Sequence, residues 1–483
     1  MPIILAPPND TAEARQLQRL AKAGNLRRIY QGIYTDDRSA PLDVVVRREL
    51  LSIIAAVAPD AIVSHRSALE SGVTPTGAVY LTGPYRRDIA LPGVTLRIRK
   101  GPGPRLEDIQ IPTPVGAAHR SAEPRALLEN LQISRARDES RRHVLGQAAV
   151  EKHLEKLLAR EGEAAFNRTR HLARDASEDL GMSAEFRKLE SVIGTLLGTR
   201  RAKLVYPTAV ARAAGAPYDE ARVDLFQRLA AHLDVNPPTI LQRREGTDRS
   251  LQAFLESYFS NYIEGTEFEL EEAHAIVMAN KPLAYREDDS HDVIGTFNAI
   301  LDSTARPMMP ADFESFEIQL KAWNRQVIFS RASKRPGDWK LEPNRAGETV
   351  FVQPELVRGT LEKGFELIAA ASTAAARAAL AMFVVAEVHP FTDGNGRTAR
   401  LATNLALSSD ARTRIIVPTV YREDYLLALK ALSRNAEPEP YVRMLNRAAE
   451  FSHWLDYSSQ PKLFRQLAES NALAQPAEAK LKF

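Results

Sequence analysis

Apolar residues recur at helical spacing along most of this chain of 483 residues. Residues 11–24 predict an amphipathic helix, and residues 43–57 predict a second, more apolar helix. Residues 135–200 combine Arg, Glu, Ala and Leu in a pattern typical of paired connector helices. Residues 365–388 are apolar and rich in alanine, which predicts one buried helix. The pattern therefore favours a mainly α protein.

Strand-like runs are short, and several of them lie near the N-terminus. Residues 26–34 predict a β-hairpin, and residues 79–81 and 94–98 predict further strands. A helix, a basic hairpin and a second helix in this order are compatible with a winged helix. We therefore expect a small, winged-helix-like α+β domain in front of a helical core.

Four segments follow from these patterns and from the prolines between them. We predict a winged-helix-like domain over residues 1–135 and a helical connector over residues 136–205. The helical core is expected over residues 206–460, and residues 461–483 are expected to form a frayed tail. The longest apolar stretch leads into the core and contains Arg377 and Glu387, so it predicts a core helix and no membrane span.

The composition excludes some kinds of site and indicates a cellular compartment. The chain has no cysteine, which excludes disulfides and thiolate metal sites and suits a reducing cytoplasm. Its first residues lack the basic and apolar regions of a signal peptide. We therefore predict a cytoplasmic protein without a membrane partner.

The small net charge of +3 is unevenly distributed. Residues 1–136 hold 18 Lys and Arg against 13 Asp and Glu, a net charge of +5. In the hairpin of this region, Arg27 and Arg28 are expected to be exposed and are candidates for contacts with DNA phosphates. A solvated basic face on a protein-docking module is the alternative interpretation.

The stretch with the most chemistry covers residues 389–400 and reads His-Pro-Phe-Thr-Asp-Gly-Asn-Gly-Arg-Thr-Ala-Arg. His389 has the side chain best suited to take a proton near neutral pH, and Asp393 offers the hard oxygen that Mg²⁺ prefers. The glycines on either side of Asn395 permit a tight turn at the start of the next helix, where free N–H groups bind anions.

Two arginines follow this turn. Arg397 and Arg400 are three positions apart, so they share a helix face and could hold one polyphosphate. An ordinary helix-loop-helix corner is the alternative for any single piece of the stretch, but the joint pattern indicates a site that binds a nucleotide and activates a hydroxyl group.

This stretch resembles the signature of the Fic family, His-x-Phe-x-(Asp/Glu)-Gly-Asn-Gly-Arg-x-x-Arg, at every fixed position, and the resemblance extends over roughly residues 250–450. It implies an all-helical core that transfers AMP from ATP to a Ser, Thr or Tyr hydroxyl of a target protein. The implied roles are general base for His389, loop anchor for Phe391, Mg²⁺ ligand for Asp393, anion hole for Gly394, Asn395 and Gly396, triphosphate contact for Arg397 and γ-phosphate contact for Arg400.

Residues 260–265 read Ser-Asn-Tyr-Ile-Glu-Gly and resemble the inhibitory motif of Fic proteins, on a helix expected at about residues 250–265. The resemblance implies that Glu264, with Ser260 at the start of the motif, pairs with Arg400 and excludes the γ-phosphate. A charged helix face is the alternative, because further Glu residues follow. In related proteins this Glu can also orient a water that removes AMP, so reverse activity is a second hypothesis.

The family also implies a β-hairpin flap that clamps an extended target segment, and residues 344–353 are the candidate. Thr349, Val350 and Phe351 supply its strand character. The chain departs from the commonest wording at Lys340, where the family usually has Arg, which leaves the register of the flap in doubt. Arg422 and Tyr425 are candidates for the wall of an adenosine pocket.

Residues 10–135 resemble, with less specific motifs, the antitoxin component of type IV abortive-infection toxin–antitoxin systems. This resemblance implies DNA binding. It supports an alternative function, a DNA-binding regulator that uses the Fic fold to sense nucleotides. A third hypothesis keeps the enzyme but has it transfer another nucleotide or remove AMP. The expected partners are ATP and a target protein that the sequence does not name, and a homodimer is among the oligomeric states left open.

Overall fold

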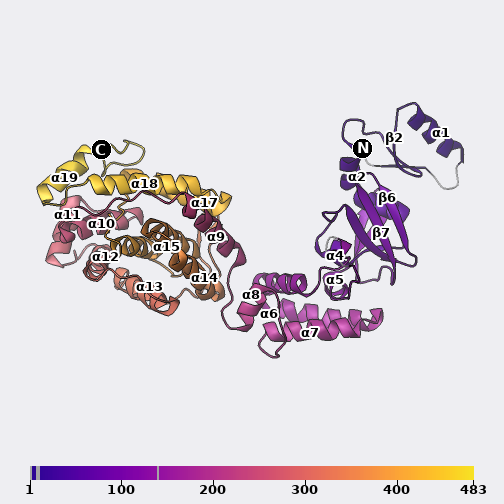
Figure 1. Cartoon of the computed structure of the whole chain (residues 1–483), viewed down its shortest axis with the longest axis horizontal. Helices are drawn as coiled ribbons and strands as arrows, with labels where there is room; N and C mark the ends of the chain where they lie inside the picture. Colours follow the sequence, from indigo (N-terminus) through magenta and orange to yellow (C-terminus); the bar gives the residue numbers. More distant parts are fainter. Residues whose placement is uncertain (1–2, 7–10, 137, 139–140) are drawn as a thin grey trace. The chain divides into compact units, whose positions relative to one another are not determined.

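The computed structural model describes residues 3–6, 11–136, 138 and 141–483. The chain divides into two compact units, residues 1–213 and residues 214–483. Within the described residues, no helix is long and apolar enough to cross a membrane. The first unit mixes helices and strands and the second is almost entirely helical, which confirms the mainly α fold class (Figure 1).

The first unit contains two sheets. A three-stranded sheet has the order β1-β3-β2, and a six-stranded mixed sheet has the order β6-β7-β5-β4-β9-β8. The strands are β1 (Ile4–Leu5), β2 (Arg27–Tyr30), β3 (Ile33–Thr35), β4 (Ile62–Val63), β5 (Ala78–Gly83), β6 (Arg87–Leu91), β7 (Val94–Lys100), β8 (Ile109–Thr113) and β9 (Gly116–Arg120). The helices are α1 (Thr11–Lys22), α2 (Leu42–Arg48), α3 (Leu50–Val57), α4 (His65–Leu69), α5 (Glu123–Asn130), α6 (Gln147–Leu180), α7 (Ser183–Leu196) and α8 (Pro207–Ala213).

The six-stranded sheet changes the picture of the N-terminal region. Strands β5 and β7 run parallel, with Val79 opposite Leu96 and Leu81 opposite Ile98, and these apolar side chains pack with those of α2 and α3. A sheet of this size is not part of a winged helix, so the interpretation of residues 1–135 as a small winged-helix-like domain gains no support. Short strands such as β4, with two residues, give too little alternation to be recognised in sequence.

The second unit carries the predicted core. Its elements are α9 (Glu220–Val235), α10 (Arg249–Ile263), α11 (Leu270–Ala279), α12 (Glu287–Ala305), α13 (Phe313–Val327), the 3₁₀ turns Ala332–Lys334, Pro354–Leu356 and Thr419–Tyr421, the hairpin β10 (Arg345–Ala346) and β11 (Thr349–Val350), α14 (Val357–Ala370), α15 (Ala374–Val388), α16 (Asn395–Ser408), α17 (Arg422–Asn435), α18 (Pro438–Trp454) and α19 (Gln460–Glu469). Figure 1 shows α15 at the centre of this unit, with α10, α12, α13 and α14 around it.

The apolar pattern of α15 explains its central place. Almost all of its side chains are buried, because it has no polar face to turn to solvent. The prediction of one helix over residues 365–388 was wrong in its continuity, since α14 ends at Ala370 and α15 starts at Ala374. The hydroxyl of Thr373 accepts a hydrogen bond from the amide of Ala376 and so caps a new helix.

The C-terminal segment is packed, and the prediction of a frayed tail over residues 461–483 was wrong. Leu463 and Leu467 of α19 are fully buried in the core of this unit, as is Ala472. Phe483 lies against the ring of Trp454, with 5.9 Å between centroids. A short amphipathic helix with so few strongly apolar residues is easily taken for a polar tail.

Candidate active site

The active-site loop begins where α15 ends. His389 follows the helix in the left-handed conformation, with φ 51°, and Pro390 prevents the helix from continuing. The imidazole Nδ1 lies 3.2 Å from the backbone oxygen of Ala386, so Nδ1 carries the hydrogen and donates it to that oxygen. This tautomer leaves Nε2 as an acceptor, as a general base requires.

The surroundings of His389 keep its imidazole neutral. The ring of Phe351 stacks on the imidazole, with centroids 3.8 Å apart and 4° between the planes. The pKa of His389 is lowered to about 4, mainly by burial and also by the nearby ammonium of Lys340, while the hydrogen bond with Ala386 and the charges of Glu264 and Asp393 only partly offset this effect. At neutral pH the ring can therefore accept a proton.

The loop after His389 is held by amide side chains. Asn395 accepts a hydrogen bond from the amide of Phe391 and donates one to its carbonyl, both at 2.8 Å. Asn324 of α13 donates to the carbonyl of Asp393, and Asn344 donates to the carbonyl of Phe391. Phe391 is fully buried, as expected for an anchor. The side chain of Asn395 therefore shapes the loop, which leaves its backbone N–H for an anion.

The start of α16 is an open helix N-terminus. Gly394 occupies the N-cap position with φ 76°, and no side chain there accepts a hydrogen bond from the first amides. A Cβ atom on Gly396 would lie 2.2 Å from Oε1 of Glu264, so a larger residue here would have to displace that carboxylate. The first turn of α16 thus offers free N–H groups, with a carboxylate directly beside them.

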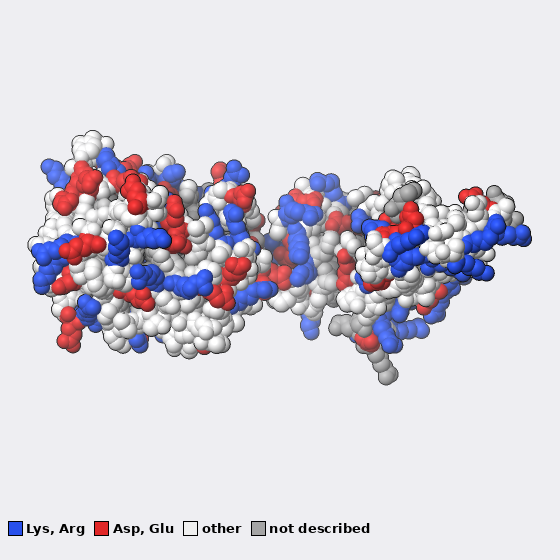
Figure 2. Space-filling view, turned by 90° about the horizontal axis from the view of Figure 1, so that it is seen from above, with Lys and Arg blue, Asp and Glu red and all other residues white. Residues whose placement is uncertain are grey.

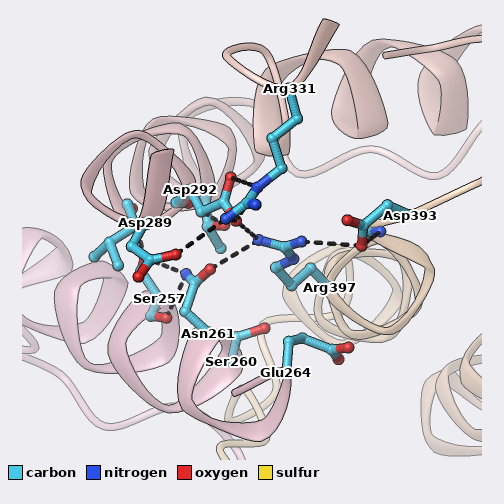
Figure 3. A network of polar contacts seen from close by, with 12 residues as sticks. Ser257, Ser260, Asn261, Glu264, Asp289, Asp292, Arg331, Asp393 and Arg397 are labelled. Atoms are coloured by element: carbon cyan, nitrogen blue, oxygen red, sulfur yellow. Dashed lines mark hydrogen bonds and ion pairs between the residues drawn. The ribbon is translucent and has the colours of Figure 1, made fainter. Parts of the chain in front are cut away.

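That carboxylate pairs with Arg400, as the sequence predicts. Glu264 Oε1 accepts a hydrogen bond of 2.7 Å from Nη2 of Arg400. Ser260 accepts two more from the same guanidinium, through its hydroxyl at 2.9 Å and its backbone oxygen at 2.8 Å. Figure 3 shows Ser260 and Glu264 at the end of the same helix, α10. The last turn of α10 therefore holds most of the donors of Arg400.

The charge of Glu264 is stable in this place. Burial raises the pKa of the carboxyl group, but the positive charges of Arg400 and Arg397 more than offset this effect and leave the pKa below its ordinary value. Glu264 is therefore ionised at neutral pH, and its side chain is still 31% exposed, whereas that of Arg400 is 7% exposed. A bound anion would compete directly with this carboxylate for Arg400.

Arg397 lies in a different environment from the one that the sequence predicts. Its Nη1 donates to Asp292 of α12 at 2.7 Å and to Asn261 of α10 at 3.1 Å. Its Nη2 lies 3.5 Å from Oδ1 of Asp393 (Figure 3). Nη1 of Arg397 is thus hydrogen-bonded to buried protein groups, and only Nη2 is directed to the loop.

Asp393 is the single carboxylate that could hold a metal ion here. Its Oδ1 accepts a hydrogen bond from the amide of Gly394, and its side chain is 35% exposed. Among the described residues, no three His, Asp or Glu side chains form a cluster that could hold a metal. One carboxylate fits Mg²⁺ that is bound mainly by substrate phosphates, which is the usual arrangement for this ion.

A cleft of about 340 Å³ joins these groups. Its lining includes His389, Gly396, Arg400 and Glu264, Thr349 and Phe351 at the hairpin, and Arg422 and Tyr425 of α17. The phenol oxygen of Tyr425 lies 3.4 Å from Nη1 of Arg400. The structure therefore brings together the base, the helix N-terminus and one of the two predicted arginines.

The predicted hairpin flap is present beside this cleft. Ala346 pairs with Thr349, and Val350, which is 50% exposed, pairs with Arg345. Arg222 of α9 donates to the backbone oxygen of Val350 at 2.7 Å and forms an ion pair with Glu387. Sequence reasoning missed Arg222, because nothing in its surroundings marks it as different from other charged helix residues.

Of the two predicted DNA contacts, only Arg28 is available at the surface. Arg27 donates to the backbone oxygens of Asp37 and Ala40, at 3.2 and 2.6 Å, and is half-buried. The prediction that it is exposed was wrong, because the segment after the hairpin folds back over it. Figure 2 shows basic side chains gathered on the N-terminal unit, on the right, while acidic and basic side chains alternate on the left.

Comparisons with known proteins agree with the site. Residues 316–407 match the family model described as Fic/DOC family, so this part of the chain is a Fic domain. The protein adenylyltransferase fic-1 of Caenorhabditis briggsae is 27% identical over 204 residues, which are 41% of this chain and 40% of that protein. The protein adenylyltransferase Fic of Drosophila mojavensis is 34% identical over 105 residues, 20% of this chain and 21% of that protein. The chain thus matches less than half the length of these relatives.

Solved structures give a weaker likeness. Fic-1 from C. elegans covers 68% of this chain and 86% of its own, with 21% sequence identity and a TM-score of 0.36. A Fic-domain signaling protein from Bacteroides thetaiotaomicron covers 48% of this chain and 95% of its own, with 19% identity and a TM-score of 0.37. These TM-scores are low, so the site is described from the geometry of this chain alone.

Proposed function

We propose that this chain is a self-inhibited protein adenylyltransferase, which transfers AMP from ATP to a Ser, Thr or Tyr hydroxyl of a target protein. The observation that carries the proposal is one cleft that holds a neutral His389, the open N-terminus of α16 and Arg400 paired with Glu264 at 2.7 Å. The names of the relatives that match the Fic domain support the same activity.

The residues divide the work of the transfer. The oxygen of the target hydroxyl attacks the α-phosphorus of ATP and passes its proton to Nε2 of His389, while the bond from the α-phosphorus to the β-phosphate oxygen breaks and pyrophosphate leaves. The amides at the start of α16 and the guanidinium of Arg400 stabilise the negative charge on the phosphates. Positioning and charge stabilisation are the main needs of such a reaction.

Asp393 would hold Mg²⁺ in this site. The ion, when bound, supplies positive charge to the phosphates. The protein's own part is to keep the carboxylate in place, through the amide of Gly394 and through Asn324, which donates to the backbone oxygen of Asp393.

The inhibition follows from the position of Glu264. Its carboxylate lies over Gly396 and accepts a hydrogen bond from Nη2 of Arg400, so it occupies a donor that the γ-phosphate would need. Its negative charge also repels that phosphate. The same carboxylate could orient a water toward an AMP-modified residue, which makes reverse activity a second proposal for Glu264.

The test is intact-mass spectrometry after incubation with ATP and Mg²⁺. We expect a mass increase of one AMP on the Glu264→Gly variant, little on the wild type, and none on Glu264→Gly combined with His389→Ala. A target protein added to the same reaction extends the test to modification in trans. Absence of AMP from every protein in all three reactions would contradict the proposal.

The alternative, a DNA-binding regulator that senses nucleotides, has no support from the site, since a sensor does not need a base such as His389 in the cleft. DNA binding through Arg28, a homodimer and a cytoplasmic location stay predictions from the sequence. A gel-shift assay of the wild type against Arg28→Ala separates DNA binding from the enzyme activity.

A further inference from the structure

Arg397 is the centre of a buried polar network that reaches three helices (Figure 3). It lies on α16 and contacts Asp292 of α12 and Asn261 of α10, and the side chains of Arg397 and Asp292 are 3% and 2% exposed. Asn261 is itself fixed, because its amide donates to the backbone oxygen of Ser257 at 2.9 Å. The network therefore holds the guanidinium from two sides.

Arg397 has few hydrogen-bond donors that are not already used within this network. A guanidinium has five N–H groups, and the two on Nη1 are directed to Asp292 and Asn261. The Nε atom is buried and has no partner among the described residues. Nη2 is the remaining group, and it lies 3.5 Å from Oδ1 of Asp393. The orientation of Arg397 thus decides how strongly its charge acts on Asp393.

Asp292 sets this orientation, although it also has a second arginine to neutralise. Nε of Arg331 contacts both of its carboxylate oxygens, at 3.2 and 3.0 Å. Arg331 pairs in addition with Asp289, one helical turn before Asp292, at 3.0 Å. Asp289 is thus shared by Arg331 and Arg286, whereas Asp292 is shared by Arg331 and Arg397.

We propose that Asp292 is a positioning residue for the Mg²⁺-binding carboxylate: by binding Nη1 of Arg397 it keeps the contact between Arg397 and Asp393 long, so that Asp393 is left to bind the metal. This inference rests on the proposed function, in which Asp393 holds Mg²⁺. Without the charge of Asp292, Asp393 is the carboxylate left to Arg397, and the present ion pair of 3.5 Å between Nη2 and Oδ1 would shorten and compete with the metal.

The experiment measures ATP binding by calorimetry in the Glu264→Gly/His389→Ala background, in which binding is separated from transfer. ATP is titrated once with Mg²⁺ and once with EDTA. We expect Asp292→Asn to weaken the binding of ATP with Mg²⁺ about tenfold, the size typical of groups that orient a metal ligand. The affinity for ATP in EDTA should change by less than about threefold, because Asp292 does not face the phosphates.

Asp289→Asn is the matched control. It removes the same charge from the same helix and from the same Arg331, but Asp289 does not contact Arg397. We expect its affinities to stay close to those of the parent protein. Equal weakening by Asp292→Asn with Mg²⁺ and in EDTA, or no weakening at all, would overturn the proposal.

A second variant covers the case in which Asp292→Asn does not fold. Asp292→Asn combined with Arg331→Met removes one negative and one positive charge, so the buried network keeps its net charge. The same selective loss with Mg²⁺ is expected, and its absence overturns the proposal. Failure of the proposed function would be seen separately, as an absence of AMP transfer by the Glu264→Gly variant in which His389 is intact.

Discussion

Helix α10 carries two Glu–Arg pairs, one with Arg400 of α16 and one with Arg414 in the segment after α16, and the two pairs differ in their surroundings. Glu256, in the middle of α10, accepts hydrogen bonds from Nε and Nη2 of Arg414 at 2.6 and 2.8 Å, and the two side chains are 4% and 1% exposed. Glu264, at the end of α10, accepts one hydrogen bond from Arg400 at 2.7 Å and is 31% exposed. The same two residue types thus form one enclosed pair and one pair beside a cleft.

The difference explains why only one of these pairs can act as a switch. No water or anion can reach Arg414, so nothing can replace the carboxylate of Glu256. Arg400 borders the cleft, and Ser260 accepts hydrogen bonds from its Nε and Nη2, so the guanidinium stays in place when Glu264 leaves. A removable partner on a fixed cation is what inhibition by a carboxylate requires.

Replacing Glu256 tests the enclosed pair and should have the largest effect. In Glu256→Gln, the buried charge of Arg414 loses its partner, and the free energy of unfolding should fall by about 3–5 kcal/mol. Urea unfolding followed by tryptophan fluorescence measures this change in the catalytic unit alone, because Trp323, Trp339 and Trp454 all lie there. A loss below about 1 kcal/mol would show that this pair, too, is readily replaced.

The same change at the other pair should leave stability almost intact and raise activity. In Glu264→Gln, the free energy of unfolding should fall by less than about 1 kcal/mol, since the side chain is partly exposed. The loss of charge weakens the contact with Arg400 by at most about 1 kcal/mol, which corresponds to AMP transfer up to about fivefold faster. The pair of variants is compared by urea unfolding and by radiolabelled ATP incorporation. Equal destabilisation at both positions would remove the distinction.

The sequence predicts the exposed pair but not the enclosed one. Glu264, Arg400 and His389 stand in short motifs that resemble those of the Fic family, and this resemblance implies the contact between Glu264 and Arg400. Glu256 and Arg414 are 158 positions apart and have no motif. Their pairing depends on how α10 packs against the end of α16, which local patterns do not specify.

The same reason accounts for the other misses. Asp292 stands in a run of acidic residues at the start of α12, and nothing in that run separates it from its exposed neighbours. The six-stranded sheet was missed because its strands pair across long separations, such as β4 with β9. Helical periodicity, in contrast, is local, and most of the predicted helices are present.

The pH dependence of the transfer sharpens the comparison at the cleft. The base works as the neutral imidazole, so activity is full above the pKa of His389 and falls as the pH drops through it, near 4 and not near 6.5. Phe351→Ala uncovers the ring and should raise this pKa by about one unit, because burial is the largest cause of the shift.

NMR titration of the His389 ring in the Glu264→Gln background measures this pKa directly. Val350→Ala is the control, since Val350 is the neighbour of Phe351 at the end of β11, is 50% exposed and has no ring to stack. Its titration should coincide with that of the parent protein. An unshifted pKa in Phe351→Ala would mean that the stacked ring does not keep water from the base.

Ser260 should have the smallest effect, and it tests whether α10 holds Arg400 independently of Glu264. Its hydroxyl accepts one hydrogen bond from Nε of Arg400 at 2.9 Å, which contributes about 1 kcal/mol. In the Glu264→Gln background, Ser260→Ala should therefore slow AMP transfer about fivefold, because Arg400 is less well positioned for the γ-phosphate. Ser303→Ala removes a similar buried hydroxyl, bonded to Ile300 within α12, and should leave the transfer rate unchanged. If both variants transferred AMP at the same rate, the backbone oxygen of Ser260 would be sufficient to position Arg400 without the hydroxyl.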